Sequence, residues 1–266
     1  MQTLIKNGQV IDPANQIDGP FDILIDKRKI SAIEPRGKIP ESKNISVIDA
    51  KDCVVAPGFC DMHVHFREPG HEYKETIETG CASAVAGGFS SVAVMPNTFP
   101  VNDNHSITEL ILSQAKKTNL ANVFPIGAIT KGLKGETLSD MGELKEAGCI
   151  GYSDDGKPVM DSELMRRALE YSRMFDLPCI QHSEILDLTR EGCMNEGIIS
   201  TELGLKGMPV EAEDIMVFRD ICLLRKTGGR LHVAHISSGG AVELVRQAKA
   251  KGLPVTCEVA PHHFTL

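Results

Sequence analysis

The chain has 266 residues, a net charge of −8 and 42% hydrophobic residues, which suits one large domain or a large domain with a small companion. This composition excludes collagen-like, disordered and disulfide-scaffold proteins, and the sequence has neither a signal peptide nor the run of about 20 apolar residues that spans a membrane. The acidic balance argues against a nucleic-acid partner, and eight scattered cysteines without a CxxC pair favour reduced thiols and a cytoplasmic location.

Residues 1–56 have the pattern of a small β module. Short apolar runs alternate with turn signals such as Asn7-Gly8, and no helical periodicity lasts for two turns. The strands expected in this module are Thr3–Ile5, Phe21–Ile25, Lys29–Ile33 and Val47–Ile48.

From residue 57 onward the pattern changes to alternating strands and helices, which indicates βα units and a parallel sheet. The expected strands are Cys60–Phe66, Ser91–Met95, Val123–Ile129, Ile150–Ser153, Cys179–His182, Leu231–Ile236 and Val255–Val259. The expected helices are Glu78–Gly87, Ile107–Lys117, Leu138–Ala147, Ser162–Phe175, Ala212–Lys226 and Ala241–Lys251. The stretch from Ser183 to Glu211 is too long for a plain connection, so it is expected to shape the site.

The positions of polar residues favour a TIM-type (β/α)8 barrel over an open doubly wound sheet. Histidine, asparagine and aspartate follow one expected strand after another, and in a barrel all strand ends converge on one face. The sequence reaches Leu266 within the seventh unit. We therefore expect residues 57–266 to be a barrel truncated after strand 7, residues 1–56 to be part of a composite β-sandwich, and the chain to be the N-terminal part of a longer protein.

The same residues are candidate metal ligands. His63 and His65 are two apart on one expected strand, so their imidazoles leave the same face, although two ordinary polar residues at a strand end would give the same spacing. Asp154-Asp155, His182 and His235 add further ligand types at later strand ends. Histidine with carboxylate suits zinc, with manganese, cobalt or iron as substitutes, and this number of ligands allows one or two ions per subunit.

Several blocks resemble one family. Residues 61–70, DMHVHFREPG, resemble the signature of dihydroorotases, within the amidohydrolase superfamily. Further similar blocks are MPNT at 95–98, GAITKGLKG at 127–135, YSDDG at 152–156 and NEGIISTELGLKGMPVEAE at 195–213. The resemblance is to dihydroorotases that use an aspartate as metal ligand in place of a carboxylated lysine.

The resemblance implies a role for particular residues. One metal would be held by His63, His65 and Asp155, and the second by His182 and His235. Arg67 and Asn97 would hold the substrate carboxylate, although Arg67 is also placed to pair with a neighbouring glutamate and Asn97 to form an Asx turn. The family's proton-shuttling aspartate would lie beyond Leu266, so no catalytic acid–base residue is assigned here and these 266 residues alone are expected to be inactive.

The expected reaction is the reversible interconversion of dihydroorotate and N-carbamoyl-L-aspartate in pyrimidine synthesis, by attack of a metal-bound hydroxide on a cyclic amide. The alternatives are another cyclic amidohydrolase, such as allantoinase or dihydropyrimidinase, and a non-catalytic scaffold for aspartate transcarbamoylase. Arg67 discriminates the first alternative, because a substrate without a carboxylate has no use for it. The expected partners are the small-molecule substrate, further copies of the chain in a homo-oligomer, and a transcarbamoylase.

Overall fold

The computed structural model describes residues 2–266. The chain divides into two units, Met1–Phe59 and Cys60–Leu266. No helix within residues 2–266 combines the length and the apolar character needed to cross a bilayer.

The first unit consists of short strands around a small core. One sheet has the order β5-β4-β1-β6 and a second has the order β3-β2-β7. The strands are β1 (Gln2–Lys6), β2 (Gln9–Asp12), β3 (Ile17–Gly19), β4 (Phe21–Asp26), β5 (Lys29–Pro35), β6 (Ile45–Asp49) and β7 (Val54–Val55), with a 3-10 turn at Pro13–Asn15. Leu4, Val10 and Ile23 are buried between them. The short strands β2, β3 and β7 were not expected from the sequence, because two to four residues carry little periodicity.

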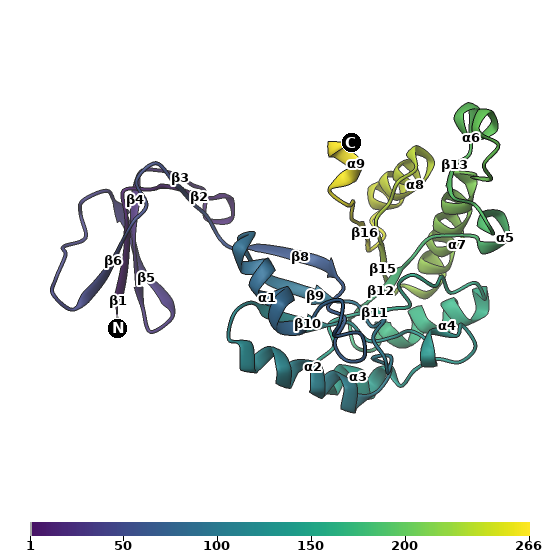
Figure 1. Ribbon diagram of the computed structural model, residues 1–266, viewed down its shortest axis with the longest axis horizontal. Helices are drawn as coiled ribbons and strands as arrows, with labels where there is room; N and C mark the ends of the chain where they lie inside the picture. The colour runs from purple at the N-terminus through teal and green to yellow at the C-terminus, as the bar shows by residue number, and fades with distance from the viewer. Residues whose placement is uncertain (1) are drawn as a thin grey trace. The chain divides into compact units, whose positions relative to one another are not determined.

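The second unit has an α/β architecture, with its strands in two sheets of order β8-β9-β10 and β11-β12-β15-β16 (Figure 1). The strands are β8 (Phe59–Val64), β9 (Phe89–Val94), β10 (Asn122–Pro125), β11 (Tyr152–Ser153), β12 (Pro178–Gln181), β15 (Arg230–Val233) and β16 (Val255–Cys257). A parallel bridge between Gly127 and Tyr152 links the two sheets. The pairs β9–β10, β11–β12, β12–β15 and β15–β16 are parallel, so the carboxyl ends of these strands share one edge.

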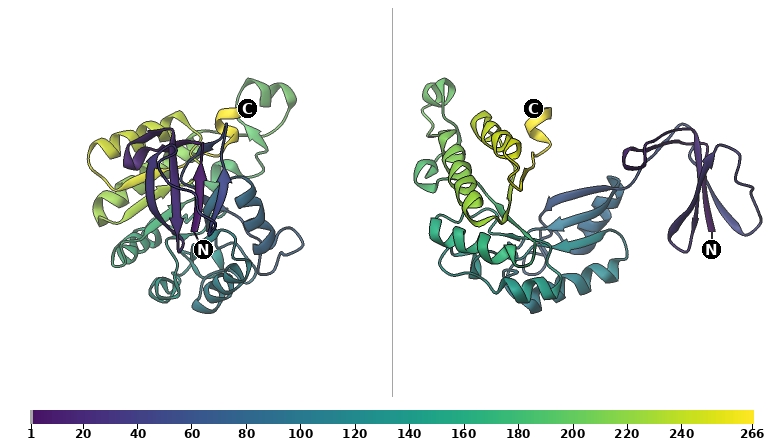
Figure 2. Two further views of the ribbon diagram at one scale, coloured as in Figure 1. Left: turned by 90° about the vertical axis from the view of Figure 1, so that its left-hand side faces the viewer. Right: turned by 180° about the vertical axis from the view of Figure 1, so that it is seen from behind.

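Helices follow the strands and pack side by side outside them, α1 against α2, α2 against α3, α4 against α7 and α7 against α8 (Figure 2). They are α1 (Ile77–Ala86), α2 (His105–Thr118), α3 (Met141–Ala147), α4 (Ser162–Arg173), α7 (Glu211–Thr227), α8 (Gly239–Ala250) and the short α9 (His262–Thr265). Side-chain caps fix where several of them begin: Asp161 accepts a hydrogen bond from the backbone N–H of Leu164 at the start of α4.

The helix expected at Leu138–Ala147 begins at Met141 instead. Leu138 is taken up in an antiparallel bridge with Thr130, and Asp140 caps the helix by accepting from the N–H of Glu143. The apolar periodicity of the sequence runs through this boundary, whereas the cap defines it.

Apolar side chains between strands and helices leave the strand ends to polar residues. Tyr152, Cys179, Leu231 and Val233 point from the strands into a core that also contains Leu169 of α4. All five are almost fully buried. This packing holds the strands in place, and the residues that follow the carboxyl ends of the strands form the site described below.

The stretch from residue 183 to 211 has structure of its own. It contains α5 (Leu186–Thr189), α6 (Ile198–Leu203) and a small parallel pair of β13 (Met194–Asn195) and β14 (Gly207–Met208). These short elements give no recognisable period in the sequence.

Candidate metal centre

The predicted ligands come from different strands and converge at the carboxyl ends. His63 is the next to last residue of β8, and His65 follows that strand. Asp155 lies two residues beyond β11, His182 directly follows β12, and His235 lies two residues beyond β15. The structure thus brings all five residues together, in two groups that could each hold a metal ion.

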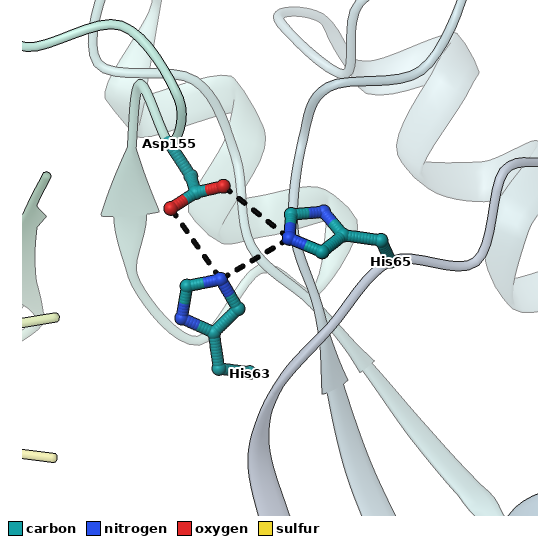
Figure 3. A group of neighbouring side chains, drawn as sticks. All are labelled: His63, His65 and Asp155. Carbon is teal, nitrogen blue, oxygen red and sulfur yellow. Dashed lines mark hydrogen bonds and ion pairs between the residues drawn. The ribbon is translucent and has the colours of Figure 1, made fainter. Parts of the chain in front are cut away.

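The first group consists of His63, His65 and Asp155 (Figure 3). The Nε2 atoms of the two histidines are 3.3 Å apart. His63 Nε2 lies 3.4 Å from Asp155 Oδ1, and His65 Nε2 lies 3.4 Å from Asp155 Oδ2. Two imidazole nitrogens and a carboxylate facing one point are a donor set that suits a divalent cation.

The second group shares Asp155 and adds His182 and His235. His182 Nδ1 is 3.1 Å from His235 Nε2. Asp155 Oδ1 lies 3.6 Å from His235 Nε2 and 4.0 Å from His182 Nδ1. One carboxylate therefore faces both groups, which is the arrangement that a bridged two-metal centre uses.

The charges within the cluster depend strongly on one another. Burial raises the pKa of Asp155, but the facing imidazoles of His235 and His63 outweigh it and hold the pKa well below its usual range. Burial lowers the pKa of His63, but the facing carboxylates of Asp155 and Glu258 outweigh it and raise the pKa to about 9. Burial is also the main reason why the pKa of His65 is lowered. A cation bound beside His63 must therefore displace a firmly held proton.

Three of the histidines are oriented by acceptors on their outer nitrogens. Asn97 Oδ1 lies 3.0 Å from His65 Nδ1, and Glu184 Oε2 lies 2.9 Å from His182 Nε2. Glu258 Oε1 lies 2.5 Å from the outer nitrogen of His63. An acceptor on one ring nitrogen leaves the lone pair on the other, so these contacts direct ligand nitrogens inward.

Backbone geometry and a nearby helix fix the loop after β15. His235 has a φ of 34°, in the left-handed region that non-glycine residues seldom occupy. Glu213 of α7 accepts hydrogen bonds from the backbone N–H groups of Ser237 and Ser238. The helix thus secures the turn that carries His235.

Arg67 and Asn97 lie next to the first group. Neither Glu68 nor Glu72 pairs with Arg67: Glu68 accepts from the N–H of Ile77 and Glu72 from that of Gly70. Within residues 2–266 the guanidinium of Arg67 has no hydrogen-bond or ion-pair partner, although its charge helps to lower the pKa of His65. The ion pair between Arg67 and a neighbouring glutamate, which the sequence allowed, is thus absent among the described residues. The half-buried guanidinium of Arg67 is therefore available to a ligand.

A cavity of about 500 Å³ opens beside the second group. It is lined by His182, His235 and Glu184, by His262 and His263 of α9, and by Asn195 and Met208 of the stretch 183–211. The expectation that this stretch shapes the site agrees with its contribution to the cavity wall. A small organic molecule can be accommodated next to the histidine cluster.

Glu184, Glu258 and His232 also lie at the site, although no pattern in the sequence singled them out. His232 is nearly buried, and its Nε2 lies 3.3 Å from Glu258 Oε2. The strand expected at Val255–Val259 contained Glu258. The observed strand β16 ends at Cys257, so Glu258 directly follows it, in the position that the candidate ligands occupy on the other strands.

Comparison with known proteins identifies the family of the chain. The Dihydro-orotase-like family model matches residues 52–241. The chain is 54% identical over 266 residues to a dihydroorotase from Syntrophotalea carbinolica, covering 100% of the chain and 62% of that protein. It is 55% identical over 262 residues to a dihydroorotase from Anaeromyxobacter dehalogenans, covering 98% of the chain and 60% of that protein. The chain thus spans about three fifths of the length of the curated relatives that it matches.

Solved structures share the fold at lower identity. An L-hydantoinase (dihydropyrimidinase) from Arthrobacter aurescens superposes with a TM-score of 0.81 at 22% identity, over 99% of the chain and 59% of that structure. A dihydropyrimidinase from Brevibacillus agri superposes with a TM-score of 0.79 at 24% identity, over 100% of the chain and 59% of that structure. With the family match over most of its length and relatives at more than half identity, the chain belongs to the dihydro-orotase-like family of the amidohydrolase superfamily.

Proposed function

We propose that this chain supplies the metal centre of a cytoplasmic dihydroorotase, which interconverts (S)-dihydroorotate and N-carbamoyl-L-aspartate in pyrimidine synthesis. The observation that carries the proposal is the sharing of Asp155 by two ligand groups that five strand-end side chains form. The names of the curated relatives support the substrate.

The proposal includes the architecture predicted from the sequence. We propose that the first seven strands of a (β/α)8 barrel are β8, β9, β10, β11, β12, β15 and β16. Residues 1–56 are proposed to belong to a β-sandwich module. The relatives' greater length leaves room for an eighth strand and for the family's proton-shuttling aspartate.

Zinc fits the residues that are present. Asp155 Oδ1 is buried and has no hydrogen-bond partner among the described residues, which is costly unless a cation or a ligand satisfies it. The histidine and carboxylate donors suit one or two zinc ions, in the two groups His63–His65–Asp155 and Asp155–His182–His235. Zinc held by these residues would lower the pKa of a water molecule towards neutrality and would polarise a carbonyl group.

Arg67 and Asn97 are proposed to bind the substrate carboxylate. The planar guanidinium of Arg67 can hold a carboxylate through two parallel hydrogen bonds. Asn97 directs its Oδ1 towards His65, so its Nδ2 group is the part that remains to donate to an anion. Both side chains flank the first ligand group, where a bound carboxylate would place the ring amide against the cluster.

The direction of the reaction follows from its charge balance. Ring opening converts a monoanion and water into a dicarboxylate and releases a proton. Acid therefore favours ring closure and alkali favours ring opening. Bound metal ions and Arg67 would give the site positive charge to hold either anion, although the whole chain has a net charge of −8.

The test is substitution of Arg67 in the full-length protein. Arg67→Ala should lower kcat/KM for dihydroorotate by far more than tenfold, and Arg67→Lys should recover only part of the loss, since it keeps the charge but not the fork. Arg225→Ala is the matched control, because Arg225 is an exposed arginine of α7 that forms no ion pair with any residue the structure describes. Hydrolysis of an uncharged cyclic amide, measured in parallel, should be slow in every variant.

Two results would overturn the assignment. An unchanged kcat/KM for dihydroorotate in Arg67→Ala, with faster turnover of the uncharged amide, would indicate an allantoinase or dihydropyrimidinase. A full-length protein that binds aspartate transcarbamoylase but turns over no cyclic amide would indicate a scaffold. Sedimentation of the same samples tests the proposed homo-oligomer.

A further inference from the structure

Glu258 joins the two outermost strands of the second unit. It directly follows β16, and its side chain is only 12% exposed. Its Oε1 atom lies 2.5 Å from Nδ1 of His63, on β8. β8 is the edge strand of one sheet and β16 is the edge strand of the other, so this contact connects two edge strands that do not pair with each other.

The contact determines which nitrogen of His63 faces the metal site. An ionised carboxylate only accepts hydrogen bonds, so Nδ1 of His63 must carry a hydrogen. In a neutral imidazole the lone pair is then on Nε2. Nε2 is the atom that faces the first ligand group, 3.4 Å from Asp155 Oδ1 and 3.3 Å from His65 Nε2.

The strand pairing holds Glu258 itself in place. Its backbone N–H donates to Val233 O, and its own carbonyl accepts from the N–H of Ile236. Its Oε2 atom lies 3.3 Å from Nε2 of His232. The β15–β16 register pairs His232 with Thr256, whose Oγ1 lies 2.7 Å from His232 Nδ1.

The pleat explains why these side chains meet. Thr256 and Glu258 are two residues apart on an extended chain, so both side chains leave the same face. His232, paired with Thr256, is within reach of both. Thr256, His232, Glu258 and His63 thus form a continuous series of polar contacts that ends at the ligand group.

We propose that Glu258 is a positioning residue, which holds Nδ1–H of His63 and so directs Nε2 of His63 into the metal site, while His232, held by Thr256, faces the other carboxylate oxygen of Glu258. This inference rests on the proposed function, because it assigns His63 as a ligand. Carboxylates behind ligating histidines contribute about 10–100-fold to metal affinity in other proteins.

The experiment compares Glu258→Met, which removes the acceptor at similar length, with Glu258→Gln, which keeps a neutral acceptor. Glu243→Met is the control, since Glu243 lies on the outside of α8 and pairs only with Arg246 and Gln247. All are made in the full-length protein. Zinc affinity is measured by competition with a chromophoric chelator. The His63 tautomer is measured by 15N NMR of the metal-free protein at a pH above the His63 pKa of about 9, where the imidazole is neutral.

Zinc binding should weaken about 10–100-fold in Glu258→Met and less in Glu258→Gln, with Glu243→Met unchanged. The metal-free Glu258→Met protein should also lose the uniform Nδ1–H form of His63. An unchanged affinity and tautomer in a folded Glu258→Met protein would overturn the proposal. If Glu258→Met does not fold, Thr256→Val tests the proposal in its place. Weaker zinc binding and a mixture of His63 tautomers in Thr256→Val would support the series of contacts, whereas the zinc affinity and His63 tautomer of the wild-type protein would overturn it.

The two proposals fail in different ways. A wild-type protein that binds no divalent metal would overturn the metal centre, whereas the NMR spectrum of the metal-free protein still tests the contact between Glu258 and His63. A wild-type protein that binds zinc with an affinity independent of Glu258 would overturn only the positioning role.

Discussion

Asp154 and Asp155 are neighbours in sequence with different surroundings. Asp155 faces the histidine cluster, whereas Asp154 is buried and accepts hydrogen bonds from the backbone N–H and the hydroxyl of Thr130. Burial raises the pKa of Asp154 to about 6, although the Thr130 hydrogen bonds oppose this shift. One carboxylate is thus available to a cation, and its neighbour secures the loop that follows β10.

We therefore expect opposite results from the two alanine variants. Asp155→Ala should lose tight zinc binding, because both ligand groups share this residue. Asp154→Ala should keep zinc binding but lower the free energy of unfolding by about 1–3 kcal/mol, since Thr130 is left without its acceptor. Chelator competition and urea unfolding measure the two properties, and equal loss of metal in both variants would contradict this division.

Asp220 gives a prediction on pH. This carboxylate of α7 is 1% exposed, and burial raises its pKa to about 6 although Arg219 opposes the shift. The pKa of Asp220 in the folded protein lies above its unfolded value of about 3.9. The protonated carboxyl therefore stabilises the folded protein fully below about pH 4, and this stabilisation is lost as the pH rises through about 6. Relative to Asp220→Asn, the wild-type protein should lose stability over this range. Urea unfolding between pH 4.5 and 7.5 measures it, and parallel stability curves would argue against the shift.

At the scale of single residues, sequence reasoning found the groups with recognisable chemistry. His63, His65, His182 and His235 stood out as imidazoles at strand ends, and the structure brings them together. The choice of Asp155 over Asp154 came from the resemblance, because spacing alone does not say which carboxylate turns inward. Glu258 was missed because its contacts are with residues far away in the sequence.

Helix α1 packs close to the end of β8 because residue 80 is a glycine. A Cβ atom at Gly80 would lie 2.3–2.7 Å from three ring atoms of Phe66, the residue that follows His65. Phe66 is 4% exposed and packs with Ile77 and Cys81 of α1. The contact sets the distance between the helix and the strand end that carries two candidate ligands.

Gly80→Ala should lower the free energy of unfolding by about 1–3 kcal/mol, although alanine is the better helix former, because Phe66 has to move. Gly239→Ala in α8 is the matched control, since a Cβ there meets nothing within 4 Å. Thermal or urea unfolding of both variants measures the difference. A Gly80→Ala protein as stable as the Gly239→Ala protein would show that the ring adapts freely.

The sequence predicted the longer elements well and the short ones poorly. Ser162–Phe175 was expected as a helix because its apolar residues repeat with helical spacing, and the structure has α4 at Ser162–Arg173 with Asp161 as its cap. β13 and β14 have two residues each, too few for an alternating pattern. These strands depend on pairing with each other, which is a tertiary contact and not a local preference.

On the scale of the whole molecule, every candidate ligand belongs to the unit Cys60–Leu266. A ligand that binds only the folded form stabilises it by about 2.7 kcal/mol at a concentration one hundred times its Kd. For a unit of this size that corresponds to a rise in Tm of roughly 5–10 °C. The unit Met1–Phe59 contains no candidate ligand within its described residues, so binding should not affect it directly.

Zinc added to chelator-treated protein should therefore raise the Tm of one calorimetric transition and leave that of the first unit in place. Asp155→Ala is the control, because it should abolish the rise. A transition of the first unit that shifts by the same amount would mean that the two units unfold together.

The contact between His63 and Glu258 also bears on how the protein is made. The two residues are 195 positions apart, and the histidines of β8 leave the ribosome long before the carboxylate that orients one of them. Closing so long a loop is slow compared with forming a helix. During synthesis, a cation that meets the early histidines finds an unfinished, weaker site, so secure capture of the metal has to wait until most of this sequence has been translated.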